Sequence, residues 1–201
     1  MRAEFEIPDL SGECFSNSWI YRQIPESISQ LFERAVGGLL LINPSLVMEP
    51  PMITELPLPS GPGQSEGHPA YDPEGAFTSV KLVDILQNVQ SIVLRQQSVA
   101  VIVSAWDTVE ESDEKKLTPE QWLNKHLPLL TQYLRSNVEW LRYKIFGVSA
   151  QGGDLRNPTI RKNLLAISRP KMRIRILEEG CEVSHDITRP IRWVVGSDSR
   201  Q

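Results

Sequence analysis

The sequence predicts an α/β fold of three layers, in which a mainly parallel sheet lies between flanking helices. Two observations support this prediction. Short apolar segments, each stopped by turn-forming residues, alternate along the chain with segments of helical periodicity. At least two of the apolar segments are continuous rather than alternating, which is typical of strands covered on both faces. We therefore expect parallel strands joined by helices that cross over the sheet.

Four segments are predicted to be buried strands because they are short, aliphatic or β-branched, and bounded by turn residues. A fifth segment, MRIRIL after Pro170, alternates in the manner of a strand near a sheet edge. The four buried strands are AEFEIP (3–8), GLLLIN (38–43), SVAVIVS (98–104) and YKIFGVS (143–149).

Helical patterns separate these strands. Pro25 can open a helix that ends at Gly37, and an apolar repeat predicts a second helix over about 76–96. Thr118 and Gln121 form a capping box that opens a third helix, which Pro128 should kink or divide. The segment HDITRPIRWVV predicts a final helix that is capped by Asp186 or Thr188 and has Pro190 in its first turn.

The chain of 201 residues is expected to form one domain over 1–196, followed by a tail, 197–201. Residues 44–75 interrupt the alternation of strands and helices. Eight of the fifteen prolines fall in this range, together with several glycines. We interpret 44–75 as a loop insertion at the surface.

Composition excludes several classes of protein. The net charge is −4 with Lys and Arg spread along the chain, so we expect neither nucleic acid nor a membrane as partner. Cys14 and Cys181 have no metal-ligating spacing. No apolar run reaches the length of a signal peptide or a membrane span, and we expect a cytoplasmic protein.

Three predicted strands end in polar, glycine-containing sequences. The first runs into DLSGE (9–13), the third into SAWD (104–107), and the fourth into SAQGG (149–153). The carboxyl ends of parallel strands meet at one edge of a sheet, where ligands bind in open α/β folds. A site at this edge is therefore expected.

These endings resemble three motifs of the Ras-like P-loop GTPases, in the family's order. DLSG resembles the DxxG motif, SAWD the NKxD or TKxD motif, and VSAQGG the SAK-type motif. The resemblance implies that Asp9 holds the shell of a magnesium ion and that the backbone N–H of Gly12 approaches the γ-phosphate. Glu13 follows that glycine, where many relatives carry the glutamine that orients water; it would act as a base or repel the phosphate.

The same resemblance assigns guanine recognition to Asp107, with GTP or GDP as the ligand. Ala105 stands where the family usually has a lysine that covers the base, so Trp106 either supplies apolar cover or is a packing residue. The backbone at Ser149 and Ala150 would close over the base. The implied base-binding residues are Ser104, Trp106, Asp107, Ser149, Ala150 and Gln151.

Several segments are most similar in sequence to the bacterial double-GTPase family. They are IPDLSGE, LLLINPS, VIVSAWD, VSAQGGD and HDITRPIRWVV. That family occurs in conflict or defence gene clusters, a context that is implied by the resemblance alone.

The sequence contains no Walker A loop, GxxxxGK[ST], which GTPases need to hold the phosphates. We expect an incomplete P-loop NTPase fold that lacks the first strand and the phosphate loop and is inactive alone. In the family that strand lies between the DxxG strand and the strand that reads GLLLIN here, so its absence leaves a gap or makes those two pair. Three explanations are open. Another polypeptide could supply the missing part, the chain could be a fragment of a longer reading frame, or it could be a degenerate remnant. We favour the fragment.

Two other classes stay open. The chain could be a non-catalytic module that binds a protein partner through its proline-rich loop or final helix. It could also be a different α/β enzyme, but His68, His126 and His185 have no metal or triad spacing, and no GxSxG elbow occurs. A solvated or structural role is expected for each histidine.

Overall fold

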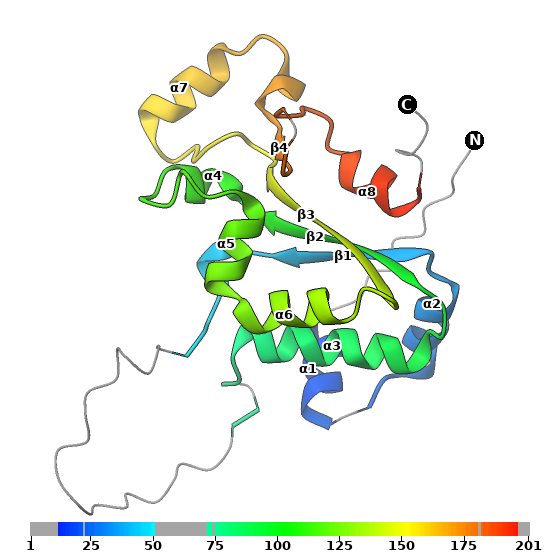
Figure 1. Cartoon of the computed structure of the whole chain (residues 1–201). Coiled ribbons are helices and arrows are strands. Elements are labelled where there is room, and N and C mark those ends of the chain that lie inside the picture. Colours follow the sequence, from blue (N-terminus) through cyan, green and yellow to red (C-terminus); the bar gives the residue numbers. More distant parts are fainter. Residues whose placement is uncertain (1–11, 22, 51–71, 74, 181, 197–201) are drawn as a thin grey trace, which may run out of the picture.

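The computed structural model describes residues 12–21, 23–50, 72–73, 75–180 and 182–196. These residues form one sheet of four strands with helices on both faces (Figure 1). In spatial order the strands are β1 (Gly37–Ile42), β2 (Gln97–Ser104), β3 (Leu141–Ser149) and β4 (Arg175–Leu177). The first three are parallel, whereas β4 runs antiparallel to β3. The predicted α/β fold with a mainly parallel sheet is confirmed.

The helices connect and cover these strands. Three of them, α1, α4 and α7, were not expected from the sequence. In chain order the helices are α1 (Gly12–Tyr21), α2 (Glu26–Arg34), α3 (Thr78–Ile92), α4 (Trp106–Glu110), α5 (Pro119–His126), α6 (Pro128–Ser136), α7 (Pro158–Ala166) and α8 (Arg189–Val194), with 3-10 turns η1 (Pro44–Leu46) and η3 (Pro170–Arg173).

The boundaries of α5 and α6 follow the sequence signals closely. Thr118 caps α5 by accepting a hydrogen bond from the backbone N–H of Gln121, and the Gln121 side chain accepts one from the N–H of Thr118. Pro128 divides the predicted helix in two, because it lacks the N–H that would continue α5 and is instead tolerated at the start of α6. The final helix α8 begins after Thr188, close to the predicted start, but no side chain caps it, because Asp186 accepts hydrogen bonds from the N–H and hydroxyl of Thr188 instead.

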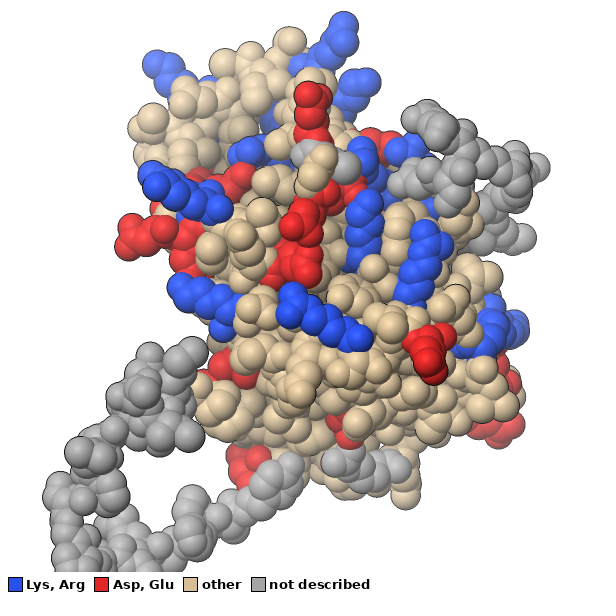
Figure 2. Space-filling model, viewed as in Figure 1, with Lys and Arg blue, Asp and Glu red and all other residues tan. Residues whose placement is uncertain are grey.

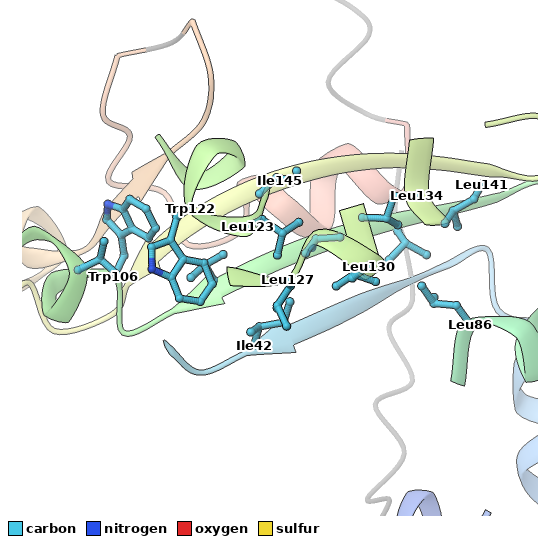
Figure 3. Packing of buried hydrophobic residues seen from close by; sticks show 14 residues of the cluster. Ile42, Leu86, Trp106, Trp122, Leu123, Leu127, Leu130, Leu134, Leu141 and Ile145 are labelled. Carbon is cyan, nitrogen blue, oxygen red and sulfur yellow. The ribbon is translucent and has the colours of Figure 1, made fainter. Parts of the chain in front are cut away.

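The larger core fills the space between one face of the sheet and helices α3, α5 and α6 (Figure 3). Successive side chains of a strand point to opposite faces, so alternate residues of β2 contribute to this core. Its fully buried members include Val101, Val103, Leu123, Leu127, Leu130, Leu134 and Leu141.

A smaller core lies on the opposite face, under α8. Phe146 and Trp193 meet edge to face, with ring centroids 6.4 Å apart. A buried carboxylate supports this packing, since Glu178 forms ion pairs with Lys144 of β3 and Arg189 of α8. Truncating one partner of such a buried ion pair leaves an uncompensated charge, so α8 is held by charge as well as by apolar contact.

Strand β1 is only partly covered. Among the described residues it pairs with β2 alone, so its other edge is open. Leu39 and Leu41, on the face of the sheet that carries α8, are 43% and 64% exposed. Open edges with exposed apolar side chains are unusual in isolated soluble domains, because they invite pairing with another strand.

Some expectations fall on residues that the structure does not describe. The predicted strand 3–8 lies wholly among them, as does most of the predicted loop 44–75. The edge strand predicted after Pro170 is present but shorter, because Pro170–Arg173 forms a 3-10 turn and only Arg175–Leu177 pairs with β3. In the described part of the chain, no helix has both the length and the apolar character needed to cross a bilayer.

Close packing around Gly147 predicts a defined effect of substitution. A Cβ at this position would lie 2.7 Å from Cδ2 of Trp106 and 3.0 Å from Cγ of Pro119. Gly147→Ala should therefore lower the free energy of unfolding by about 1–3 kcal/mol, which urea denaturation would measure. Gly38→Ala is the matched control, because nothing lies within 4 Å of its Cβ position and a change within about 0.5 kcal/mol is expected. Equal effects of the two variants would contradict this packing.

Candidate functional site

The carboxyl end of β2 turns directly into a short helix. The Ser104 hydroxyl donates to the carbonyl of Ile42, 3.1 Å away, which ties the ends of β2 and β1 together. Ala105 then adopts φ 47° and ψ 41°, in the left-handed region, at a cost of roughly 1–2 kcal/mol for a residue with a side chain. The chain reverses within this single residue, and Asp107 is placed in the first turn of α4.

Asp107 is held by the end of the neighbouring strand. The Ser149 hydroxyl donates to Oδ1 of Asp107 over 2.5 Å, and the N–H of Gly152 donates to the same Ser149 oxygen over 2.9 Å. Ser149 is fully buried and Asp107 is half-buried. Oδ2 of Asp107 accepts no hydrogen bond from the described residues. The carboxylate is therefore oriented from one side and keeps capacity for a ligand on the other.

Trp106 lies in the core, only 1% exposed. Its ring packs over Gly147 of β3, and Pro119 of α5 lies against the same glycine. Figure 3 shows Trp106 at the end of the larger core. The sequence left two roles open for this tryptophan, apolar cover of a base and packing in the core. The structure shows the packing role. In this arrangement the ring has no free surface with which to cover a ligand.

The turn after β3 presents the remaining candidate residues. Ala150 and Gln151 are exposed and lie directly after Ser149. Gly152 has φ +84°, and a Cβ there would lie 2.5 Å from the carbonyl oxygen of Arg173. Only glycine fits both the backbone angle and this approach. The turn therefore brings Ser149, Ala150 and Gln151 to the same edge of the sheet as Ser104 and Asp107.

An ion pair that was not expected from the sequence lies near Asp107. Glu110, the last residue of α4, forms an ion pair with Arg175 of β4 over 2.6 Å. Burial raises the pKa of Glu110 above its usual value; Arg175 opposes this shift, and the negative charge of Asp107 adds to it. Glu110 also begins the acidic run EESDEKK (110–116), so the first residue of this run is engaged in the fold.

The described histidines have structural partners, as expected. His126 stacks on Trp122, with ring centroids 4.7 Å apart, and its Nε2 lies 2.9 Å from both carboxylate oxygens of Glu114. Nδ1 of His185 lies 2.6 Å from the carbonyl of Ile174. His68 lies outside the described residues.

The residues expected to bind the phosphates and the metal lie at or beyond the limit of the described residues. Asp9 falls outside the described residues, and although Gly12 and Glu13 belong to the first turn of α1, their side-chain surroundings are not described either. The roles assigned to DLSGE remain predictions from the sequence. In the described ranges, no three His, Cys, Asp or Glu residues are grouped as metal ligands.

The mainly parallel sheet between helices is that of an α/β domain and is compatible with a partial P-loop NTPase fold. In it, an aspartate after one strand is held by a serine that ends the next. Residues 1–194 match the family model described as Double-GTPase 1, and the chain belongs to this family. The resemblance that the sequence motifs indicated is confirmed. Comparisons with curated proteins and with solved structures give no match.

The buried hydrogen bonds of Ser149 predict a local loss of stability on truncation. Ser149→Ala would leave the N–H of Gly152 without its acceptor and release the Asp107 carboxylate. We expect a decrease of about 1–3 kcal/mol in the free energy of unfolding, measured by chemical denaturation. Ser91→Ala is the control, since Ser91 makes one exposed hydrogen bond to the carbonyl of Asn88, and its loss should cost less than about 0.5 kcal/mol. A Ser149→Ala variant as stable as the control would argue against a held carboxylate.

Proposed function

We propose that this chain forms the base-recognising part of a guanine-nucleotide-binding GTPase domain. The observation that carries the proposal is the Asp107 carboxylate, which stands at the carboxyl end of β2 and is fixed through Oδ1 by Ser149. An ionised carboxylate only accepts hydrogen bonds. Guanine presents two neighbouring donors, N1–H and the exocyclic amino group, whereas adenine does not present this pair. Asp107 therefore provides the chemistry that selects guanine.

The other base-binding assignments rest on position at the same edge. The exposed Ala150 and Gln151 follow Ser149, and the backbone of this turn would close over the base. Ser104 contributes by tying β2 to β1 behind the turn. Trp106 supports the site from the core, where it fixes the start of α4.

The proposed binding of phosphates and metal is supported by the family match and by the DLSGE sequence. Asp9 would hold the magnesium shell, Gly12 would approach the γ-phosphate and Glu13 would lie beside attacking water. Bound magnesium would neutralise charge on the phosphates. The sequence supplies no GxxxxGK[ST], so the chain alone offers no lysine and glycine-rich loop for the β- and γ-phosphates.

The open edge of β1 supports a partner that completes the domain. Main-chain groups along this edge have no strand partner among the described residues, and Leu39 and Leu41 stay exposed beside it. A strand added there, followed by a helix over the leucines, would satisfy the edge and cover the apolar surface. We propose that a polypeptide segment carrying the phosphate loop occupies this position, either as an upstream part of a longer protein or as a separate chain.

The same observation favours the second candidate, a non-catalytic interaction module. An exposed edge beside two exposed leucines would accept a complementary strand with or without a phosphate loop. The two candidates differ in whether the completed assembly binds GTP.

Hydrolysis by the isolated chain is the first test. We expect no magnesium-dependent release of phosphate from GTP above the rate without protein, because nothing in the sequence can hold the β- and γ-phosphates as a Walker A loop does. A malachite-green assay with the purified chain measures this. Hydrolysis that disappears in Asp107→Asn would contradict the proposed dependence on a completing segment.

Base selection is the second test, carried out with the phosphate-loop segment supplied. Asp107→Asn should weaken GTP binding at least about tenfold, because it removes an ionised acceptor, and should improve binding of xanthosine triphosphate, whose carbonyl accepts from the new amide. Competition with a fluorescent nucleotide measures both affinities. Asp113→Asn, an exposed aspartate in the following loop, is the matched control. Unchanged GTP affinity in Asp107→Asn would disprove the assignment of this residue.

A further inference from the structure

Positive charge is concentrated in one segment of this acidic protein. Residues 155–177, named here the basic segment, contain no Asp or Glu, although the whole chain carries a net charge of −4. The expectation of evenly spread Lys and Arg therefore does not hold for this part of the chain. The basic segment contains Arg156, Arg161, Lys162, Arg169, Lys171, Arg173 and Arg175.

The basic segment projects from the domain beyond the carboxyl ends of β2 and β3. It contains α7, η3 and β4, and α7 stands away from the sheet (Figure 1). Lys and Arg side chains gather over this end of the molecule (Figure 2). In α7 only Leu164 is buried, so the helix contributes little to the core. A charged helix with one buried residue is not explained by packing alone.

Most of these cations are not used by the fold. Arg175 pairs with Glu110, and Arg173 donates to the carbonyl of Ile167. Arg156 forms an ion pair with Asp154 at the surface, where such pairs contribute little. The other four are exposed and have no ion-pair partner among the described residues; they are Arg161, Lys162, Arg169 and Lys171.

Aliphatic side chains are exposed among these cations. Leu165 is 60% exposed, and it follows Lys162 and Arg161 by three and four residues, so all three share one face of α7. Leu155 and Met172 are each 40% exposed. A shallow, open depression of about 320 Å³ lies on this face, lined by Arg156, Pro158, Arg161, Lys162 and Leu165. Its lining suits an anionic group that is attached to an aliphatic chain.

We propose that the basic segment binds the surface of an anionic phospholipid bilayer, with Arg161 and Lys162 on lipid phosphates and Leu165 directed into the acyl boundary. A projecting helix with cations around an apolar residue is complementary to the surface of such a bilayer, where anionic headgroups lie above an apolar interior. Nucleic acid fits less well, because the basic segment has no aromatic residue or histidine to stack on bases and its leucines would face phosphates. An acidic peptide would need a groove, and the depression is shallow and open.

The proposal is independent of nucleotide binding and is tested with the full chain. Flotation with vesicles of phosphatidylcholine and phosphatidylglycerol should recover the protein, whereas vesicles of phosphatidylcholine alone should not. Each exposed Lys or Arg near an anionic surface contributes roughly fivefold in affinity, so Arg161→Glu/Lys162→Glu should weaken binding at least about 25-fold. Leu165→Ser should weaken binding by roughly three- to tenfold. Binding should also fall with added salt.

Matched variants distinguish binding through the basic segment from a general effect of the protein's net charge. Lys115→Glu/Lys116→Glu changes the net charge equally at exposed positions outside the basic segment, and Leu94→Ser removes a leucine that is 95% exposed. Both should bind the anionic vesicles as the wild type does, and thermal melting should show all variants folded. The proposal is overturned if anionic vesicles fail to bind, or if Lys115→Glu/Lys116→Glu loses as much affinity. Binding of single-stranded RNA or polyglutamate, sensitive to Arg161 and Lys162 and without vesicle binding, would overturn it equally.

Discussion

The arrangement of the candidate site depends on the contact between Trp106 and Gly147. The buried indole lies where a side chain on β3 would otherwise stand, and so it locks the start of α4 against the neighbouring strand. This contact offsets the left-handed conformation of Ala105, which the chain needs in order to turn from β2 into α4 within one residue. Asp107 follows the anchored tryptophan and consequently meets Ser149 at the end of β3.

The stability of the sheet is distributed unevenly around this site. Strands β2 and β3 are covered on both faces by the two apolar cores, and β4 closes the far edge of β3. Strand β1, in contrast, pairs along one edge only among the described residues and keeps exposed leucines. The end of the sheet that carries Asp107 and Ser149 therefore lies on strands that both cores cover, whereas β1 is covered less completely by the described residues.

The described fold was largely predictable because its signals are local. Short, mainly apolar segments marked β1, β2 and β3, and Thr118 and Pro128 marked the limits of α5 and α6. Helix α7 was missed although Asn157 and Pro158 give it an ordinary start. The pairs that shape the site join residues far apart in sequence: Asp107 with Ser149, and Glu110 with Arg175. Such pairs follow from strand register, which sequence pattern alone does not reveal.

The turn after β3, which holds Asp107 through Ser149, is joined to the basic segment by close contacts. Gly152 donates to Ser149, and its α-carbon abuts the carbonyl of Arg173, where even a methyl group would clash. Two residues later Arg175 pairs with Glu110 on the helix that carries Asp107. The burial that raises the pKa of Glu110 also strengthens its attraction to Arg175, because water screens the pair less. A displacement of η3 or β4 must therefore move the turn that orients Asp107, since no free space separates them.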